Sequence, residues 1–521
     1  SNGLLIRVSL VRAQVGEPFY KGFLGSLFLN MQNKKDIVDL TIVGGGLMSF
    51  TLAVLISEIY PDKKIKIIER LNRCGQESSN ELNNAGTGHA SYCELNYTPI
   101  NKKGEVNIDK AIQINESFEK SLEFWAYLDT KYKSFNLKNF LKITPHISFV
   151  WGEENTNFLK KRFNVLKKQP LFKEMEFSSD AKVISKWAPL LFDGRNTKEK
   201  VAATKINHGT DINFSALINE LFLILKTKKN FQIELDTEIK NIKFLKNETY
   251  NLIAKHKKNI TKHEIHTKKL FIGAGGMSIS LLHKIGVKEI KSYAGFPLSG
   301  KWLICKNKEL IKKHSAKVYS QAFKNAPPMS IPHLDIRSID NSPVLMFGPF
   351  AGITTKFLKN GSFMDFFKSI RPNNFYSLLY VAINNLGLLK YLISQSLMSK
   401  SSKIKQLKAF FPNTKNEDWV CKDAGIRVQI IKRGLDNKAK LEFGTEILFS
   451  NNNSLAGLIG ASPGASTACF SMIQIIEKFY KDKLLDKKIK KIIPSYNLEL
   501  NQEPLILKKI RTKTYKKLGL W

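Results

Sequence analysis

The sequence predicts a mixed α/β fold in which a domain built on a parallel sheet is interrupted by a second domain. A strand, a glycine turn and a helix follow one another over residues 39–59, and a short strand at 65–69 ends in an acidic residue. Two later apolar strands, 270–276 and 458–467, also run into small residues. Because these later segments lie far along the chain, one parallel sheet can contain all four only if other structure is inserted between them.

The glycine turn has the residues that a dinucleotide-binding turn requires. Gly44 permits the tight turn, Gly46 lets the backbone approach a pyrophosphate, and the small Ser49 lets the helix pack closely on the strand. The N-terminus of that helix offers N–H donors to phosphate. Glu69, at the end of the second strand, can accept hydrogen bonds from the ribose hydroxyls. The alternative is a glycine-rich turn in an unrelated α/β domain.

The two later glycine segments favour FAD over NAD. The first can pack against the glycine turn without colliding with a cofactor, and the second leads into a helix whose N-terminus could face the edge of a flavin where negative charge develops. We therefore predict a Rossmann-like FAD-binding domain of the glutathione-reductase/D-amino-acid-oxidase type. The cofactor-binding positions predicted in these segments are Gly273, Gly275, Gly460, Gly464, Ala465 and Ser466.

The 521-residue chain has an ordinary globular composition but an unusual charge. Lys and Arg number 82 against 45 Asp and Glu, a net charge of +37 that predicts an anionic partner. Nucleic acid, an anionic membrane surface and acidic small molecules all fit this charge. The basic residues are spread along the chain rather than gathered in a recognisable nucleic-acid-binding module, so we expect no nucleic-acid partner and keep a basic nucleic-acid-binding protein only as the different-class alternative.

Cysteine and hydropathy patterns exclude further classes. The five cysteines include no Cys-x-x-Cys pair, so we expect neither a disulfide framework nor a metal site. The longest apolar stretches, 377–383 and 386–393, are shorter than the roughly 18 residues that a spanning helix needs. A protein of this kind that meets a membrane would lie on its surface. Residues 1–36 form an extension that resembles an organellar targeting segment, with a plain exposed extension as the alternative.

Several long blocks of sequence form a family pattern. The longest runs from Glu69 to Pro99 and contains Ala-Gly-Thr-Gly-His at 85–89. The other blocks are 144–152, 207–214, 293–302, 326–337, 347–352 and 460–467. Together they resemble the malate:quinone oxidoreductases, which are peripheral membrane flavoproteins. The likeness covers about residues 38–480, and both termini fall outside it.

This resemblance implies oxidation of (S)-malate to oxaloacetate by hydride transfer to FAD, with the electrons passed to a membrane quinone, which links the tricarboxylic acid cycle to the respiratory chain. It implies a peripheral position on an anionic membrane surface: the inner mitochondrial membrane in a eukaryote, otherwise the cytoplasmic face of the cell membrane. Another FAD-dependent 2-hydroxy-acid dehydrogenase, such as an L-2-hydroxyglutarate dehydrogenase, is the alternative. The further cofactor-binding positions are Arg70, Ser78, Ser79, Asn84, Gly86 and Gly88.

The same pattern predicts how the domains are divided. The expected boundaries are 1–36 for the extension, 37–110, 200–290 and 415–482 for a discontinuous FAD-binding domain, 111–199 and 291–414 for a substrate and quinone-side domain with a mixed sheet and helices, and 483–521 for a basic C-terminal tail.

Oxidation of a 2-hydroxy acid needs a base for the hydroxyl proton and cations for the carboxylates. His333, Asp335 and Arg337 alternate along one segment. If this segment is a strand, the three side chains share a face, where Asp335 could orient His333 as the base and Arg337 could bind a carboxylate. The alternative is a surface strand with a local ion pair.

Four further residues are candidates for the active site. His89 follows the turn that passes beside the flavin ring in this superfamily, and His208 lies in a Gly-Thr-Asp turn, so both are predicted catalytic residues. Arg427 and His146 are predicted to bind substrate. For the histidines the alternative is a purely structural hydrogen-bonding role.

Two basic segments could contact lipid headgroups. Residues 363–380 combine aromatic and apolar residues with Lys368 and Arg371, a composition typical of a surface at the headgroup boundary or of helices packed within the substrate domain. The lysine-rich tail, 483–521, is either solvated or bound to anionic lipid.

Overall fold

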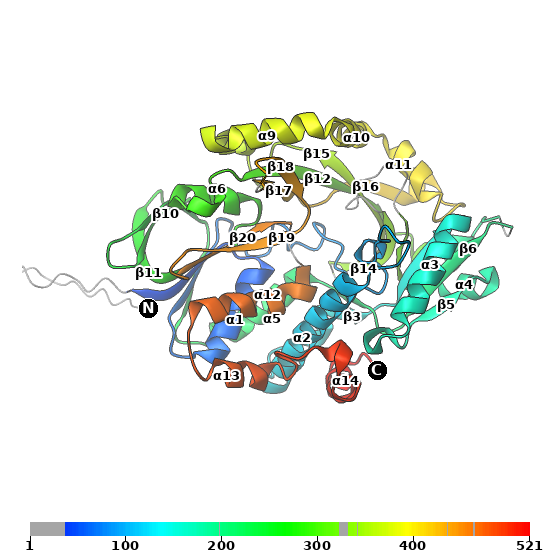
Figure 1. Cartoon of the computed structure of the whole chain (residues 1–521), viewed down its shortest axis with the longest axis horizontal. Helices are drawn as coiled ribbons and strands as arrows, with labels where there is room; N and C mark the ends of the chain where they lie inside the picture. Colours follow the sequence, from blue (N-terminus) through cyan, green and yellow to red (C-terminus); the bar gives the residue numbers. More distant parts are fainter. Residues whose placement is uncertain (1–36, 197, 322–331, 341, 435, 462–463) are drawn as a thin grey trace, which may run out of the picture. The chain divides into compact units, whose positions relative to one another are not determined.

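The computed structural model describes residues 37–196, 198–321, 332–340, 342–434, 436–461 and 464–521. Residues Val38–Trp521 form one compact unit. Within the described residues this unit contains an eight-stranded sheet, called the first sheet below, and a ten-stranded sheet, called the second sheet (Figure 1). The predicted extension, 1–36, and its targeting role lie outside the described residues.

The first sheet has the parallel core that the sequence predicts. Its parallel strands, in spatial order, are β8 (Phe231–Glu234), β2 (Ile65–Ile68), β1 (Val38–Val43), β11 (Lys262–Ile272) and β20 (Leu455–Gly460). The antiparallel strands are β19 (Thr445–Phe449), β9 (Thr237–Phe244) and β10 (Tyr250–His256). The predicted strands at 39–43 and 65–68 are thus β1 and β2, and the two later glycine segments follow β11 and β20 directly.

Helices cover this sheet and explain why its strands are apolar on both faces. Helix α1 (Leu47–Ile59) packs against α5 (Phe214–Lys226) and α12 (Gly464–Phe479), and α12 also contacts α2 (Asp109–Lys131) (Figure 1). Every residue of α1 other than Glu58 is buried, as expected for a helix that packs on all sides. Helix α6 (Ser278–Ile285) contacts β9 and β20.

The second sheet is mostly antiparallel. Its strands, in spatial order, are β18 (Ala439–Glu442), β17 (Arg427–Arg433), β12 (Ala294–Cys305), β15 (Ser342–Ile353), β14 (His333–Ile339), β13 (Lys317–Tyr319), β4 (His146–Trp151), β6 (Val201–Ile206) and β5 (Glu176–Ser178), with β16 (Trp419–Asp423) also paired to β12. A separate two-stranded sheet joins β3 (Leu141–Ile143) to β7 (Thr210–Ile212). The segment that contains His333 is therefore a strand.

The remaining helices surround the second sheet and the C-terminal region. Helix α10 packs on β15, and α9 packs on β17 and β18, so this pair covers the outer side of the sheet (Figure 1). The bounds are α3 (Glu153–Leu166), α4 (Ala181–Trp187), α7 (Lys308–Lys312), α8 (Asp365–Ser369), α9 (Pro372–Asn384), α10 (Leu386–Leu397), α11 (Lys400–Leu407), α13 (Leu485–Ile492) and α14 (Pro504–Leu518).

The strands are distributed between the sheets differently from the expected domain boundaries. Strand β6 and strands β16–β18 belong to the second sheet although they fall inside segments assigned to the FAD-binding domain. Helix α2 falls in the segment assigned to the substrate domain but packs on α12. The tail, 483–521, contains α13 and α14, and Arg511 and Tyr515 on α14 are buried against α2. An apolar strand or helix can be recognised locally, but its sequence does not state which sheet it joins.

Candidate active site

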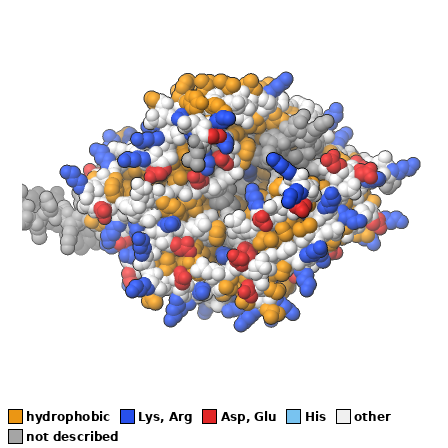
Figure 2. Space-filling view, viewed as in Figure 1, with side chains coloured by type: hydrophobic (Ala, Val, Ile, Leu, Met, Phe, Trp, Pro, Cys, Tyr) orange, Lys and Arg blue, Asp and Glu red, His pale blue; other side chains and the backbone are white. Residues whose placement is uncertain are grey.

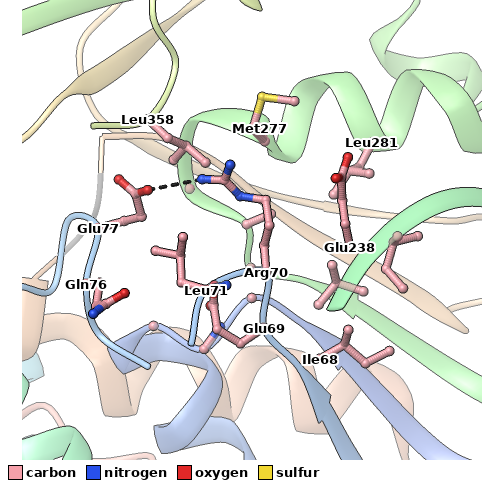
Figure 3. A pocket seen from close by; sticks show the side chains of 18 of the residues that line it. Ile68, Glu69, Arg70, Leu71, Gln76, Glu77, Glu238, Met277, Leu281 and Leu358 are labelled. Carbon is pink, nitrogen blue, oxygen red and sulfur yellow. Dashed lines mark hydrogen bonds and ion pairs between the residues drawn. The ribbon is translucent and has the colours of Figure 1, made fainter. Parts of the chain in front are cut away.

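The carboxyl ends of β1, β2 and β11 surround an open cavity of about 880 Å³. This edge of a parallel sheet is where nucleotides bind in folds of this type. The side chains of Arg70 and Glu77 lie across the cavity, with Arg70 Nη2 3.2 Å from Glu77 Oε1 (Figure 3). Among the predicted cofactor-binding residues, those that line the cavity are Gly44, Gly46, Glu69, Arg70, Ser78, Ser79, Gly273 and Gly275.

The glycine turn is confined by its neighbours. Gly44 has φ +103°, and a Cβ atom there would lie closer than 3.0 Å to the carbonyl oxygen of Gly273. Gly273 in turn lies over Ser49, whose buried hydroxyl has no hydrogen-bond partner among the described residues. The ends of β1 and β11 therefore lie so close together that a Cβ atom at Gly44 has no room. The turn between β1 and α1 lines the cavity and stays open to a ligand.

Glu69 is fixed at the floor of this cavity. Its Oε2 accepts the N–H of Gly45 at 2.6 Å and its Oε1 accepts the N–H of Leu71 at 2.8 Å. Burial raises the pKa of Glu69, and these two N–H donors oppose the increase. Glu69 thus presents a carboxylate directly after β2, and its role in binding a ribose stays a prediction.

Three predicted cofactor-binding residues lie on a turn that leaves the cavity toward the second sheet: Asn84, Gly86 and Gly88. Asn84 donates its amide hydrogens to the carbonyls of Ser78 and Asn80 and accepts the N–H of Gly86, so it shapes the loop. The backbone of the turn then pairs with β7, through Ile212 N–H to Gly86 O and Gly88 N–H to Thr210 O. This turn connects the cavity to His89.

The predicted flavin-facing helix, α12, starts at Gly464. Gly460, at the end of β20, has φ +86°. Ala465 and Ser466 are buried in the first turn of α12, and the Ser466 hydroxyl has no hydrogen-bond partner among the described residues. The positive end of the α12 dipole at this terminus can stabilise an anionic edge of a cofactor.

Behind the turn lies a group of five buried side chains, called the charged cluster below: Asp211, Lys317, His333, Asp335 and Arg337. His333 Nδ1 lies 2.8 Å from Asp335 Oδ2, which confirms that the alternating residues of β14 share one face. Burial would raise the pKa of Asp335, but the charges of His333 and Lys317 outweigh it and hold that pKa well below its usual range. Asp335 therefore stays ionised beside Nδ1 of His333.

Arg337 is held inside the protein rather than presented to a substrate. Its Nε lies 2.8 Å from Asp211 Oδ1, and its Nη1 donates to the carbonyl of Asn84 at 2.7 Å. The guanidinium lies directly beneath Gly86, where a Cβ atom would collide with it. Its Nη2 has no hydrogen-bond partner among the described residues. The carboxylate-binding role predicted for Arg337 therefore fits better a cation whose side chain is accessible to solvent.

Arg427 is such a cation. Its side chain is accessible to solvent, and it lines a smaller cavity of about 400 Å³ together with Asn83, Trp302 and Ala351. Desolvation by the surrounding protein lowers the pKa of Arg427, and the charges of Tyr319, Tyr97 and Glu94 oppose the decrease. Because an arginine remains protonated across the physiological range, Arg427 keeps a positive charge in this cavity.

His89 lies between the charged cluster and the aromatic side chains near Arg427. Its ring packs edge-on against Tyr97 and Tyr319 at centroid distances of 6.0 and 5.9 Å. Burial lowers the pKa of His89 to about 3, with further contributions from His146, His333 and Lys317. His89 is therefore neutral at physiological pH. A neutral imidazole can still form hydrogen bonds with a substrate or with the edge of a cofactor.

His146 lies close enough to His89 to affect its pKa, whereas His208 contacts residues outside the charged cluster. His146 Nε2 lies 3.0 Å from the Thr210 carbonyl and 3.1 Å from its backbone nitrogen, and burial lowers the pKa of His146 to about 3. His208 Nε2 lies 3.0 Å from the Tyr92 hydroxyl, and its Nδ1 lies 3.2 Å from Glu174. The structure thus groups His333 with His89 and separates His208 from them.

Three residues of the site were missed by the sequence analysis: Lys317, Tyr319 and Asp211. The Tyr319 ring stacks on His333 at a centroid distance of 4.2 Å and an interplanar angle of 1°, and its hydroxyl lies 2.8 Å from Thr87 Oγ1. Lys317 and Asp211 complete the charged cluster. A signal existed for Lys317, because a lysine between Ala316 and Val318 in an apolar strand needs a buried acidic partner.

Comparison with solved structures identifies the fold. The fold matches the FAD-bound L-α-glycerophosphate oxidase of Mycoplasma pneumoniae with a TM-score of 0.57 and 16% identity, over 85% of this chain and 94% of that one. Glycine oxidase from Bacillus cereus gives a TM-score of 0.51 at 15% identity, over 86% and 97%. The fold is therefore that of the FAD-dependent oxidases, an α/β fold with mixed sheets.

The sequence comparisons are more specific. Residues 36–520 match the family model of malate:quinone oxidoreductase. Probable malate:quinone oxidoreductases of Bacillus mycoides and Bacillus cereus are each 46% identical over 94% of this chain and 98% of their own length. The chain belongs to the malate:quinone oxidoreductase family.

Proposed function

We propose that this protein is an FAD-dependent malate dehydrogenase that oxidises (S)-malate to oxaloacetate and delivers the electrons to quinone. The observation that carries the proposal is the pairing of His333 with the ionised Asp335 close to His89, at the end of the turn that leaves the cofactor cavity. An oriented imidazole is the group that removal of a hydroxyl proton near pH 7 requires. Family membership specifies which hydroxy acid it serves.

The residues at the first sheet fit FAD. An extended dinucleotide would meet three features here. The turn at Gly44 has no room for a side chain, and Glu69 is held by a backbone N–H. The buried hydroxyls of Ser49 and Ser466 have no hydrogen-bond partner among the described residues. Gly44–Gly46 and the N-terminus of α1 would hold the pyrophosphate, Glu69 the ribose, and the start of α12 the flavin edge. The chemistry that bound FAD supplies is acceptance of a hydride from C2 of malate and onward transfer of two electrons.

The remaining roles follow from the accessible groups. His333 would take the hydroxyl proton through Nε2, because the carboxylate of Asp335 lies 2.8 Å from the other ring nitrogen, Nδ1. Arg427 would bind a malate carboxylate through two parallel N–H donors. The neutral His89 would donate to, or accept from, the substrate or the flavin edge.

Anaerobic titration tests the proposed function directly. The purified protein should show a flavin absorption spectrum that is bleached by L-malate and restored by a soluble quinone analogue. Bleaching by L-2-hydroxyglutarate instead of malate would favour the alternative hydroxy-acid dehydrogenase. A protein with no bound flavin and no malate turnover after addition of FAD would refute the proposal.

Replacing Arg427 by glutamine is expected to raise KM for malate about ten- to hundredfold, because a charge-assisted bidentate contact is lost. Steady-state kinetics with an artificial electron acceptor measures this, and R427K should recover part of the affinity by restoring the charge. An unchanged KM in R427Q would show that the carboxylate binds elsewhere.

We further propose that the protein lies on an anionic membrane surface through the apolar face of α8, α9 and α10. The space-filling view shows hydrophobic side chains gathered over α9 and α10 (Figure 2). The exposed members of this face are Phe363, Met364, Phe367, Ile370, Phe375, Tyr376, Leu379, Ile383, Leu386, Ile393 and Leu397. Lys356 lies over the ring of Phe363 and Arg433 over that of Tyr376, so cations surround the apolar face.

The helices of this face do not form a regular transmembrane span. In the described part of the chain, no individual helix has the length and apolar composition to cross a bilayer; α9 and α10 meet that criterion only when taken together, and they are bent by 79°. A peripheral position, on the inner mitochondrial membrane or on the cytoplasmic face of a bacterial membrane, would place this face among headgroups.

Replacing Phe375 and Leu386 together by glutamine is expected to reduce binding to vesicles containing phosphatidylglycerol by about tenfold or more, since each buried large side chain contributes roughly 1.5–3 kcal/mol. Flotation measures the bound fraction. Leu505→Gln, on the exposed side of α14, is the matched control and should float like the parent protein. Loss of binding in L505Q alone would assign the contact to the C-terminal helix.

A further inference from the structure

The charged cluster contains a lysine that the proposed reaction does not itself use. Lys317 Nζ lies 2.8 Å from Asp211 Oδ1 and 3.3 Å from Asp335 Oδ2, and it donates to the carbonyl of Ala85 at 2.9 Å. Its side chain is 0% exposed. The ammonium thus donates to Ala85 and Asp335 and forms an ion pair with Asp211, so its partners belong to three elements: the turn beside the cofactor cavity, β14 and β7.

The formal charges of the cluster balance when His333 is neutral. Lys317 and Arg337 carry two positive charges, and Asp211 and Asp335 carry two negative charges. Buried charges are tolerated when they are paired in this way, and removal of one partner leaves the other uncompensated. Loss of one member of the cluster would therefore leave an unbalanced charge close to His333.

The cluster also connects the turn to the base. Lys317 and Arg337 bind the consecutive carbonyls of Ala85 and Asn84, while Asp335, which Lys317 contacts, lies against His333 Nδ1. Because Nδ1 faces Asp335, Nε2 is the ring nitrogen that is directed away from the carboxylate.

We propose that Lys317 is a positioning residue, which together with Asp211 fixes His333 relative to the turn at the cofactor and sets the charge that His333 experiences. The proposal rests on the proposed function only in naming His333 as the base. Other titratable groups near the cluster are His89 and Cys93 on the turn segment, His146 on β4, His314 before β13, and Tyr319 on β13.

Opposite single substitutions test this proposal. K317M removes a positive charge, which favours protonated His333, so the acidic limb of the pH–kcat/KM profile should move up by about one pH unit. D211N removes a negative charge, so the limb should move down by a similar amount. The double variant K317M/D211N restores the balance and should return the limb close to that of the parent. K308M, at an exposed lysine of α7, is the control and should leave the limb unchanged.

A readout without turnover separates this proposal from the proposed function. The imidazole titration of His333, followed by NMR of histidine-labelled protein and assigned with H333Q, should shift in the same opposite directions whichever acid the enzyme oxidises. Shifts in the same direction for K317M and D211N, or unshifted titration in both, would overturn the proposal. If K317M alone does not fold, D211N and the charge-balanced double variant still give the downward shift and its reversal, and absence of either result would refute it.

Discussion

Replacing His333 by alanine is expected to lower malate turnover by about a hundredfold or more, while FAD remains bound. A positioned general base typically contributes 10²–10⁴ in rate. His333 lies in β14 of the second sheet, whereas the residues that line the cofactor cavity come mainly from β1, β2, β11 and the loops after them. Loss of the imidazole should therefore reduce kcat without removing the flavin absorption.

Two histidine controls make this result specific. His263→Ala, at a partly exposed position of β11, should keep full turnover. His208→Ala tests the second predicted base, and we expect a smaller effect than for H333A because His208 contacts Tyr92 and Glu174 rather than the charged cluster. Turnover in H333A equal to that of the parent, or a larger loss in H208A, would assign the base to another residue.

Replacing Gly44 by alanine is expected to weaken FAD binding by about ten- to hundredfold. The added Cβ would press against the Gly273 carbonyl, and an L-residue at φ +103° is strained by roughly 1–3 kcal/mol. Relief of this contact requires β1 and β11 to separate at the point where the pyrophosphate would sit. Flavin retained after gel filtration, together with a titration of the apoprotein with FAD, measures the loss.

Gly104 provides a matched control for the strain alone. It has φ +79° in an exposed turn, and a Cβ atom there would meet nothing within 4 Å. G104A should therefore retain FAD like the parent protein. Equal retention in G44A would show that the close approach of the two turns is unimportant for the cofactor.

The first sheet could be predicted because its signals are local. The strand, glycine turn and helix at β1 and α1 follow directly from residue type, and the acid after β2 falls where the fold requires it. The sheet that each later strand joins could not be predicted equally well. Strand β17 begins at Arg427 and lies close in sequence to β20, but it pairs with β12 in the second sheet, and this pairing depends on contacts between distant segments.

The candidate site shows the same division. Alternation along β14 correctly predicted that His333 and Asp335 share a face. It could not predict that Arg337 forms an ion pair with Asp211 and a hydrogen bond with the Asn84 carbonyl, because neither partner is close to it in sequence. Residue type indicates which chemistry a side chain can perform, whereas the availability of that side chain depends on partners that only the folded chain brings near.

The pairing of α14 with α2 has a consequence for synthesis of the protein. Glu119 on α2 is buried, and its Oε1 accepts hydrogen bonds from Arg511 and Tyr515 on α14. Until those late residues leave the ribosome, α2 carries a carboxylate that is unfavourable to bury without its cation. We therefore expect the FAD-binding region to remain incompletely packed during translation and to need protection from aggregation until α14 has emerged.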